Sequence, residues 1–243
     1  MFLHLLIIKL QKEPNKGPYQ LKLGSYFELK DYKNMVKVGE EIVRIWPDDK
    51  KAWVSLGKYY LQTEDYKTGL ATMEVAYKNG YFETEVDYKV LSNFYSLNEI
   101  PYKAAKVLEK SIDDKIVKRT KANISAVASN YHRSKDIAKA AKYYEEAAKF
   151  DDDAELYRKA GSLLLQSQNY SAAVVRLNKA LELGSDKQGT IYSDLAEAYY
   201  YQEKYKQAYA AITKAMDDPR TRKFAKGWSA FIKDKAARNG VKI

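Results

Sequence analysis

The sequence repeats one arrangement of small residues at intervals of 33 to 36 positions. Five segments, which begin near residues 50, 85, 121, 154 and 189, have Gly, Ala or Ser at the eighth, twentieth and twenty-seventh positions in all fifteen cases. In the fourth segment these residues are Gly161, Ala173 and Ala180. Small side chains let two antiparallel helices approach to about 8–10 Å between their axes. The spacing therefore predicts tandem helical hairpins that stack on one another.

Large residues recur between the small ones. Tyr60, Tyr95, Tyr131 and Tyr199 share the eleventh position, and we expect most of the 22 tyrosines to pack between helices. No proline interrupts a predicted helix, and Pro101 stands where a second helix of a hairpin begins. The 11 Gly and 5 Pro are too few for the many tight turns of a β-sandwich or barrel. The sequence therefore predicts an all-α fold.

Hairpin repeats account for nearly the whole chain. An irregular copy precedes the five regular ones. We expect repeats over 16–49, 50–84, 85–120, 121–153, 154–188 and 189–219, followed by a basic capping helix and tail over 220–243. Residues 1–15, with the apolar string Phe2–Leu10, are expected to be the remaining second helix of a preceding repeat. A signal peptide is disfavoured, since His4 and Lys9 interrupt the string and no small-residue cleavage site follows.

Residues that carry catalysis or bind metals are scarce. The chain has no Cys, and its two His are His4 and His132, which excludes thiolate sites and disfavours a His-based metal cluster. Phosphate-binding loops, HExxH and GxSxG are absent from the sequence. The acidic run Asp151–Asp153 lacks the pattern of a calcium loop and is predicted to cap a helix. We therefore predict no catalytic residues, no metal, no cofactor and no enzymatic activity.

Positive charge is concentrated at the C-terminus. Eight Lys or Arg and one Asp give residues 220–243 a net charge of +7, out of +10 for the chain. Phe224, Trp228 and Ile232 recur every four residues, with Ala225 and Ala236 on or beside them, and predict an apolar stripe that covers the last hairpin. The other faces carry a basic patch, which consists of Arg222, Lys223, Lys226 and Lys233. This patch predicts either a solubilising surface or a contact with an acidic partner or an anionic membrane.

Neither nucleic-acid binding nor a membrane-spanning segment is expected. Lys outnumbers Arg 34 to 8, whereas surfaces that read nucleic acid favour Arg, so nucleic acid is not predicted as a partner. No run approaches the 18 apolar residues of a membrane-spanning helix, so no transmembrane segment is predicted. Peripheral contact with a membrane stays open.

The hairpin pattern resembles that of a known repeat family. The order Trp53, Leu56-Gly57, Tyr60, Tyr66, Gly69, Met73 and Ala76, with its copies, resembles the tetratricopeptide repeat (TPR) over about residues 16–220. The resemblance implies a right-handed superhelical solenoid of about six hairpins that binds proteins. Strings such as PNKGPYQLKLGSYFELKDY and FAKGWSAFIKDKAARNGVKI are similar to the C-terminal part of TPR proteins found with TonB energy-transduction systems in marine gammaproteobacteria. That similarity implies an N-terminally incomplete, periplasmic chain with an accessory role in transport; a chain complete as given would be cytoplasmic.

In the TPR superhelix the first helix of each hairpin lines a concave groove, and this places the candidate binding residues. The groove positions are occupied by Lys58, Lys89, Asn93, Ser129, His132, Arg133, Arg158, Lys159, Ser162, Glu197, Tyr200 and Tyr201. Cationic donors in such a groove suit an extended peptide with acidic side chains. A complete carboxylate clamp of the TPR type is not predicted, because Ala126 and Glu155 stand where that clamp needs Asn and Lys.

The predicted function is therefore non-catalytic binding of a protein or peptide partner in the groove. Two alternatives stay open. The basic C-terminal helix could act on its own by binding a membrane surface or a polyanion. The chain could also be an outer-membrane assembly scaffold, although such scaffolds usually carry a lipidated N-terminal Cys, which this sequence lacks.

Overall fold

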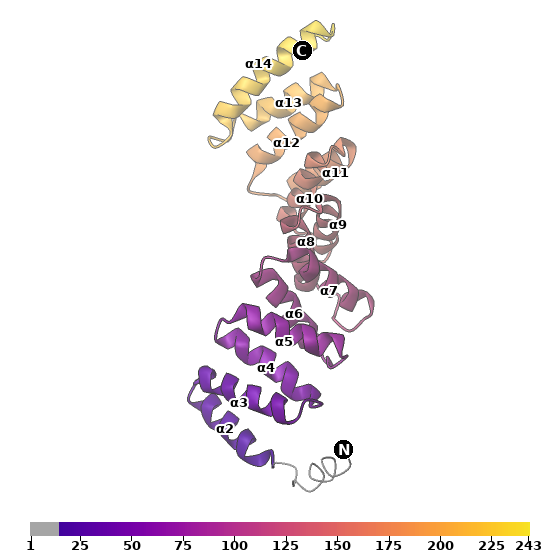
Figure 1. Cartoon of the computed structure of the whole chain (residues 1–243). Helices are drawn as coiled ribbons and strands as arrows, with labels where there is room; N and C mark the ends of the chain where they lie inside the picture. The colour runs from indigo at the N-terminus through magenta and orange to yellow at the C-terminus, as the bar shows by residue number, and fades with distance from the viewer. Residues whose placement is uncertain (1–14) are drawn as a thin grey trace. The chain divides into compact units, whose positions relative to one another are not determined.

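The computed structural model describes residues 15–243, and this range contains thirteen α-helices and no strands (Figure 1). The prediction of an all-α fold is confirmed. The helix predicted over Phe2–Leu10 lies outside the described residues. The chain forms two compact units, which divide between Ile100 and Pro101.

From residue 15 onwards, unit 1 contains five helices, each packed against the next in the chain. They are α2 (Gly17–Glu28), α3 (Tyr32–Ile45), α4 (Lys50–Gln62), α5 (Tyr66–Lys78) and α6 (Glu85–Leu97). The first helices of the predicted hairpins are α2, α4 and α6, and the second helices are α3 and α5. None of the residues of α2 is buried, whereas α3, α4 and α5 each bury one face.

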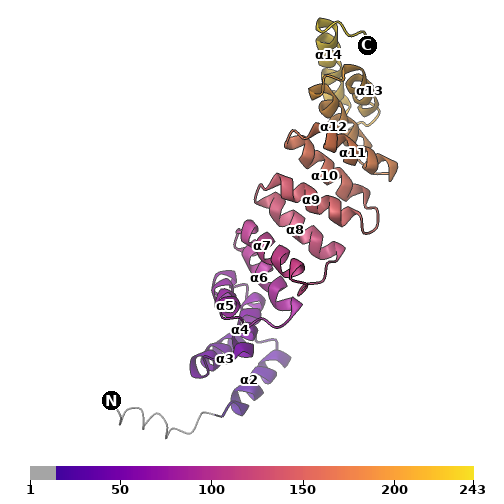
Figure 2. The same ribbon diagram turned by 90° about the vertical axis from the view of Figure 1, so that its right-hand side faces the viewer.

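Unit 2 has the same alternation of first and second helices (Figure 2), over eight helices. They are α7 (Pro101–Asp113), α8 (Lys121–Arg133), α9 (Ile137–Ala148), α10 (Ala154–Gln166), α11 (Tyr170–Glu182), α12 (Gln188–Tyr201), α13 (Tyr205–Ala215) and α14 (Arg222–Arg238). Here the first helices of the hairpins are α8, α10 and α12. The C-terminal helix α14 follows the last hairpin, which α12 and α13 form. Consecutive helices pack side by side, and α12 also contacts α10 and α14.

Polar residues fix the ends of the helices. Six helices begin after an Asp or Asn whose side chain accepts a hydrogen bond from the backbone N–H three residues later. Asp153 does this for α10, at 3.0 Å from the N–H of Leu156, which confirms the predicted capping role. Within each hairpin the turn uses one residue with positive φ: Lys30, Glu64, Glu99, Lys135, Gln168 or Glu203.

The small residues of the repeat lie at the helix crossings. All fifteen are buried, and the Ala residues among them are fully inaccessible. A Cβ added to Gly161 of α10 would lie 2.7 Å from Cγ of Leu177 on α11, and one added to Gly57 would lie 2.3 Å from Sδ of Met73. These distances leave no room for a larger side chain. The predicted reason for the small residues, close approach of two helices, is therefore confirmed.

The C-terminal helix packs on the last hairpin with only part of the predicted stripe. Its buried residues are Ala225, Ser229, Ile232 and Ala236, which face α13. Of the predicted stripe, Ile232 is fully buried, Trp228 is half-buried and Phe224 is 52% exposed. The prediction was therefore wrong for Phe224, because the small residues Ala225 and Ser229 let α14 approach closely and turn its aromatic face aside.

Candidate partner-binding surfaces

The basic groove residues of unit 1 are engaged with carboxylates. Lys58 Nζ lies 2.8 Å from Oδ1 of Asp87, which is 3% exposed. Burial alone would raise the pKa of Asp87, but hydrogen bonds from Lys58 and Thr84 lower it. Lys89 Nζ lies 3.3 Å from Oε1 of Glu85, one turn earlier on α6, and Asn93 is exposed. Lys58 therefore compensates a buried charge, while Asn93 faces solvent.

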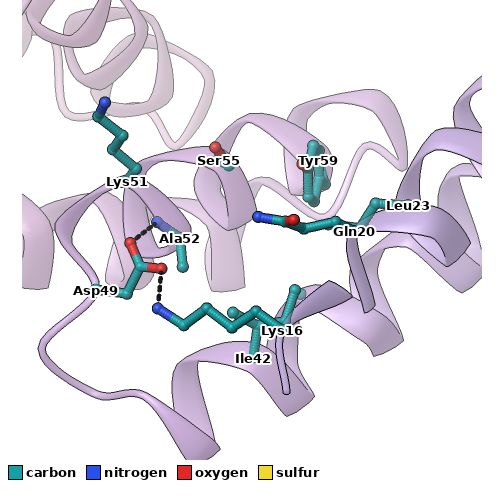
Figure 3. A pocket seen from close by; sticks show the side chains of 10 residues that line it. Lys16, Gln20, Leu23, Ile42, Asp49, Lys51, Ala52, Ser55 and Tyr59 are labelled. Atoms are coloured by element: carbon teal, nitrogen blue, oxygen red, sulfur yellow. Dashed lines mark hydrogen bonds and ion pairs between the residues drawn. The ribbon is translucent and has the colours of Figure 1, made fainter. Parts of the chain in front are cut away.

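Unit 1 also has a cavity that sequence reasoning missed. It has a volume of about 160 Å³ and lies between α2 and α4, with Gly39 and Ile42 of α3 also lining it (Figure 3). An ion pair of 2.9 Å between Lys16 and Asp49 closes one side. Gly39 is the residue that could have signalled the cavity, since the irregular first copy has it where a larger residue stands in the other copies.

In unit 2, three of the predicted groove residues meet around one tyrosine. Tyr144 of α9 is buried, and its hydroxyl is hydrogen-bonded to Ser129 of α8. The His132 ring meets the Tyr144 ring edge-on, with centroids 6.2 Å apart. Lys159 of α10 places its Nζ 5.6 Å from the centroid of the same ring. The structure thus brings polar side chains of α8 and α10 together into one surface that includes the cation of Lys159, and Arg133 is exposed beside it.

The surroundings of Arg158 and Ser162 on α10 contain more acidic groups than predicted. Arg158 makes two hydrogen bonds of 2.7 and 2.8 Å to Glu155, and Lys187 adds a third at 3.0 Å. Those contacts lower the pKa of Glu155 to about 2 against the opposing effect of burial. Ser162 donates a hydrogen bond of 2.5 Å to Oδ2 of Asp194 on α12. Arg158 is therefore a half-buried structural cation.

Beyond these residues, an aromatic surface joins α12 to α14. Tyr200 contacts the rings of Trp228 and Phe231, at centroid distances of 5.8 and 5.3 Å. Tyr201 stacks on Tyr170 at 5.1 Å. The rings of α14 were missed as partners of Tyr200 because the predicted register turned Phe224 and Trp228 into the core.

The basic patch of α14 is largely exposed. Lys223, Lys226 and Lys233 are exposed, while Arg222 donates hydrogen bonds to the backbone carbonyls of Met216 and Asp217. By helical spacing, Lys226 and Lys233 lie on the opposite side of α14 from Phe224 and Phe231. The basic patch and the aromatic surface are therefore separate faces of one helix.

Two further properties bear on what these surfaces can do. Within residues 15–243, no group of three or more His, Asp or Glu side chains is placed to hold a metal ion. Across the same part of the chain, the helices are too short or too polar for any of them to traverse a bilayer. The surfaces offer hydrogen bonds, charges and aromatic rings, which are means of binding.

The architecture is shared with solved TPR structures. YrrB, described as a TPR protein with an unusual peptide-binding site, is 15% identical with a TM-score of 0.56, over 78% of this chain and 96% of YrrB. The C-terminal part of a TPR protein from Cytophaga hutchinsonii is 16% identical with a TM-score of 0.55, over 77% and 72% of the two chains. A TPR protein from Parabacteroides merdae is 14% identical with a TM-score of 0.51, over 91% of each chain. No family model and no curated protein matches the sequence.

Proposed function

We propose that this chain, a solenoid with the tetratricopeptide-repeat fold, is a non-catalytic scaffold that binds an extended segment of a protein partner. The fold is supported by the solved structures above. One observation carries the binding role: the first helices of unit 2 present a series of polar and aromatic side chains that are exposed or only partly buried. The series runs from Ser129 and His132, through Lys159, to Tyr200.

The cationic part of this series supports an acidic side chain in the partner. Lys159 and His132 both contact Tyr144, so an incoming carboxylate would meet two donors held over one ring. Exposed charge pairs of this kind contribute about 0.2–1 kcal/mol each and weaken with salt. Binding at this end is therefore modest and sensitive to ionic strength.

The cellular location of the chain and the system in which it acts are part of the same proposal. Similarity of the terminal sequence strings to TPR proteins of TonB systems supports an accessory role in a TonB-type transport system, and with it a periplasmic location. The partner would then be an envelope protein. Fractionation of cells that express the chain from its natural locus tests the location, and recovery with the cytoplasmic fraction would remove this part of the proposal.

Site-specific photo-crosslinking tests the binding surface. A photoreactive residue at Ser129, which is exposed on α8, should capture the partner in cells. The matched control is the same residue at Val175, which is 60% exposed on α11 and belongs to a second helix. Equal capture from Val175, or none from Ser129, would contradict the proposed surface.

Charge reversal tests the chemistry of the same surface. Lys159→Glu should weaken capture from Ser129, whereas Lys179→Glu on α11 should leave it unchanged. Arg158 is unsuitable for this test, because its bidentate contact with Glu155 makes it part of the fold.

A second candidate function rests on the exposed basic patch of α14. Lys223, Lys226 and Lys233 could attract an anionic membrane surface or a polyanion. Cosedimentation with vesicles that contain phosphatidylserine, compared with neutral vesicles, tests it. Binding that is lost when the three lysines become Gln, while capture from Ser129 persists, would establish this function beside the first.

A further inference from the structure

We propose that the surface formed by Glu197, Tyr200, Trp228 and Phe231 takes an Arg or Lys side chain of the bound segment. This inference rests on the proposed scaffold function and specifies part of the partner's chemistry. It adds a cationic residue to a partner that the sequence alone predicts to be acidic.

The three rings form one cluster that is open to solvent. Tyr200 contacts Trp228 and Phe231, and these two rings lie 6.0 Å apart with planes at 70°. Phe231 is 50% exposed, and Phe224, which lies 5.9 Å from Trp228, is 52% exposed. Contiguous exposed rings of this kind mark interaction sites more often than single exposed apolar residues do.

The contact of α14 with α13 does not require these rings. The contact of α14 with α13 uses Ala225, Ser229, Ile232 and Ala236, which lie on an adjacent face of the helix. A helix that serves as a cap alone presents a polar outer face. The aromatic face of α14 lies outside the contact with α13, and its rings Trp228 and Phe231 contact Tyr200 of α12.

A carboxylate without a partner stands beside the ring cluster. Glu197 precedes Tyr200 by one turn of α12, so the two side chains share a face. Within residues 15–243, Glu197 has no hydrogen bond and no ion pair. Burial raises its pKa, and the nearby Asp194 raises it further. A positive charge placed here would relieve the repulsion between these two carboxylates.

The combination of rings and carboxylates selects a cation. Ring faces attract ammonium and guanidinium groups, and a carboxylate adds a charge-assisted hydrogen bond. An acidic segment or an anionic lipid would be repelled by Asp194 and Glu197. A purely apolar segment would desolvate Glu197 without compensation. Arg suits the site best, because its planar guanidinium can stack on a ring while it pairs with a carboxylate.

Lys235 sets the orientation of the bound cation. It follows Phe231 by one turn on α14 and is exposed, so it would repel a cation at that end of the cluster. The cation is therefore held at the end formed by Glu197 and Tyr200. The series of surfaces along unit 2 then suits a segment whose acidic residue lies near Lys159 and whose basic residue follows towards α14.

Titration with capped peptides tests the site. In ¹⁵N spectra of the full chain, acetyl-Arg-Gly-Arg-amide should shift the indole signal of Trp228 and saturate. The same peptide with Glu or norleucine in place of Arg should not. Glu197→Gln should raise the dissociation constant about fivefold, the size expected for one exposed charge pair. The matched control, Glu182→Gln on the exposed side of α11, should leave it unchanged.

Other results would overturn the site. Equal shifts with the Glu or norleucine peptide, no shift with the Arg peptide, or an unchanged constant in Glu197→Gln each contradict it. Concentration-dependent shifts without peptide would identify a second copy as the occupant, and shifts caused by phosphatidylserine vesicles would identify a membrane. Phe231→Ala, checked for helix content, gives a second variant that should also weaken Arg binding.

The scaffold proposal can fail independently of this site. If crosslinking from Ser129 captures a partner while the Arg peptide does not bind, the scaffold stands and the cation site is wrong. If the Arg peptide binds but Ser129 captures nothing, the site stands as a cation-binding surface and the scaffold proposal is wrong.

Discussion

Tyr131 of α8 donates a hydrogen bond of 2.5 Å from its hydroxyl to Oε2 of Glu109 on α7. The bond ties the first helix of one hairpin to the second helix of the hairpin before it. Unit 1 contains the same arrangement twice, because Tyr60 donates to Glu40 at 2.5 Å and Tyr95 donates to Glu74 at 2.6 Å. The eleventh position of the repeat therefore supplies a recurring polar link between stacked hairpins.

We expect Tyr131→Phe to lower the free energy of unfolding by about 1–3 kcal/mol, the range for a buried hydrogen bond to a charged group. The ring would keep its packing, while Glu109 would lose one of its donors. Urea denaturation followed by circular dichroism measures the change. Tyr102→Phe is the control, since Tyr102 is 52% exposed, and should cost less than about 0.5 kcal/mol. Equal losses in the two variants would show that the link adds nothing.

Glu109 should make the stability of unit 2 depend on pH in the acid range. Burial opposes its ionisation, but hydrogen bonds from Tyr131, Tyr143 and Lys106 lower its pKa to about 2, from 4.5. Since the folded pKa is the lower one, the carboxylate stabilises the fold above about pH 4.5. This stabilisation, on the order of 3 kcal/mol, declines as the pH falls towards 2.

Comparison with Glu109→Gln isolates this effect. The parent chain should be the more stable at pH 7, and the difference should shrink steadily between pH 5 and pH 2. Denaturation midpoints measured at intervals across that range test the expectation. A difference that stays constant with pH would mean that the pKa of Glu109 is not lowered in the folded chain.

Two glycines should respond to alanine in opposite directions. A Cβ at Gly161 would lie 2.7 Å from Leu177 Cγ and 3.2 Å from the Leu177 backbone nitrogen, so we expect Gly161→Ala to cost about 1–3 kcal/mol. Nothing lies within 4 Å of a Cβ at Gly227 in α14, so Gly227→Ala should stabilise the chain by about 0.5–1 kcal/mol. Thermal unfolding of both variants measures this contrast. Stabilisation by Gly161→Ala would show that α10 and α11 do not cross closely there.

The sequence predicted the parts of the fold that depend on one hairpin. Gly161 and Ala173 show this, because the space between two helices of one hairpin limits the size of both side chains. The polar links between hairpins were not predicted. Whether Glu109 reaches Tyr131 depends on how far one hairpin is rotated against the next, and the repeat pattern does not contain that rotation.

The candidate site shows the same limit. The periodicity placed Ser129, His132 and Lys159 on first helices, and the structure brings them together around Tyr144. The periodicity could not show that Glu155 binds Arg158. An Arg and a Glu on the same helix give the same sequence pattern whether the pair is buried or exposed. Nor could it separate the two faces of α14, because the change from Phe224 to Ala225 as the packing residue depends on the approach to α13.

Ile232 and Phe231 are neighbours on α14 and should have opposite roles. Ile232 is fully buried against the last hairpin, so Ile232→Ala should cost about 2–4 kcal/mol through the cavity that it leaves. Phe231 is 50% exposed, so Phe231→Ala should cost less than about 1 kcal/mol. Denaturation of both variants, followed by helix content, measures the difference. If Phe231→Ala proves the more damaging of the two, the aromatic face of α14 belongs to the core, and it is not free to bind a partner.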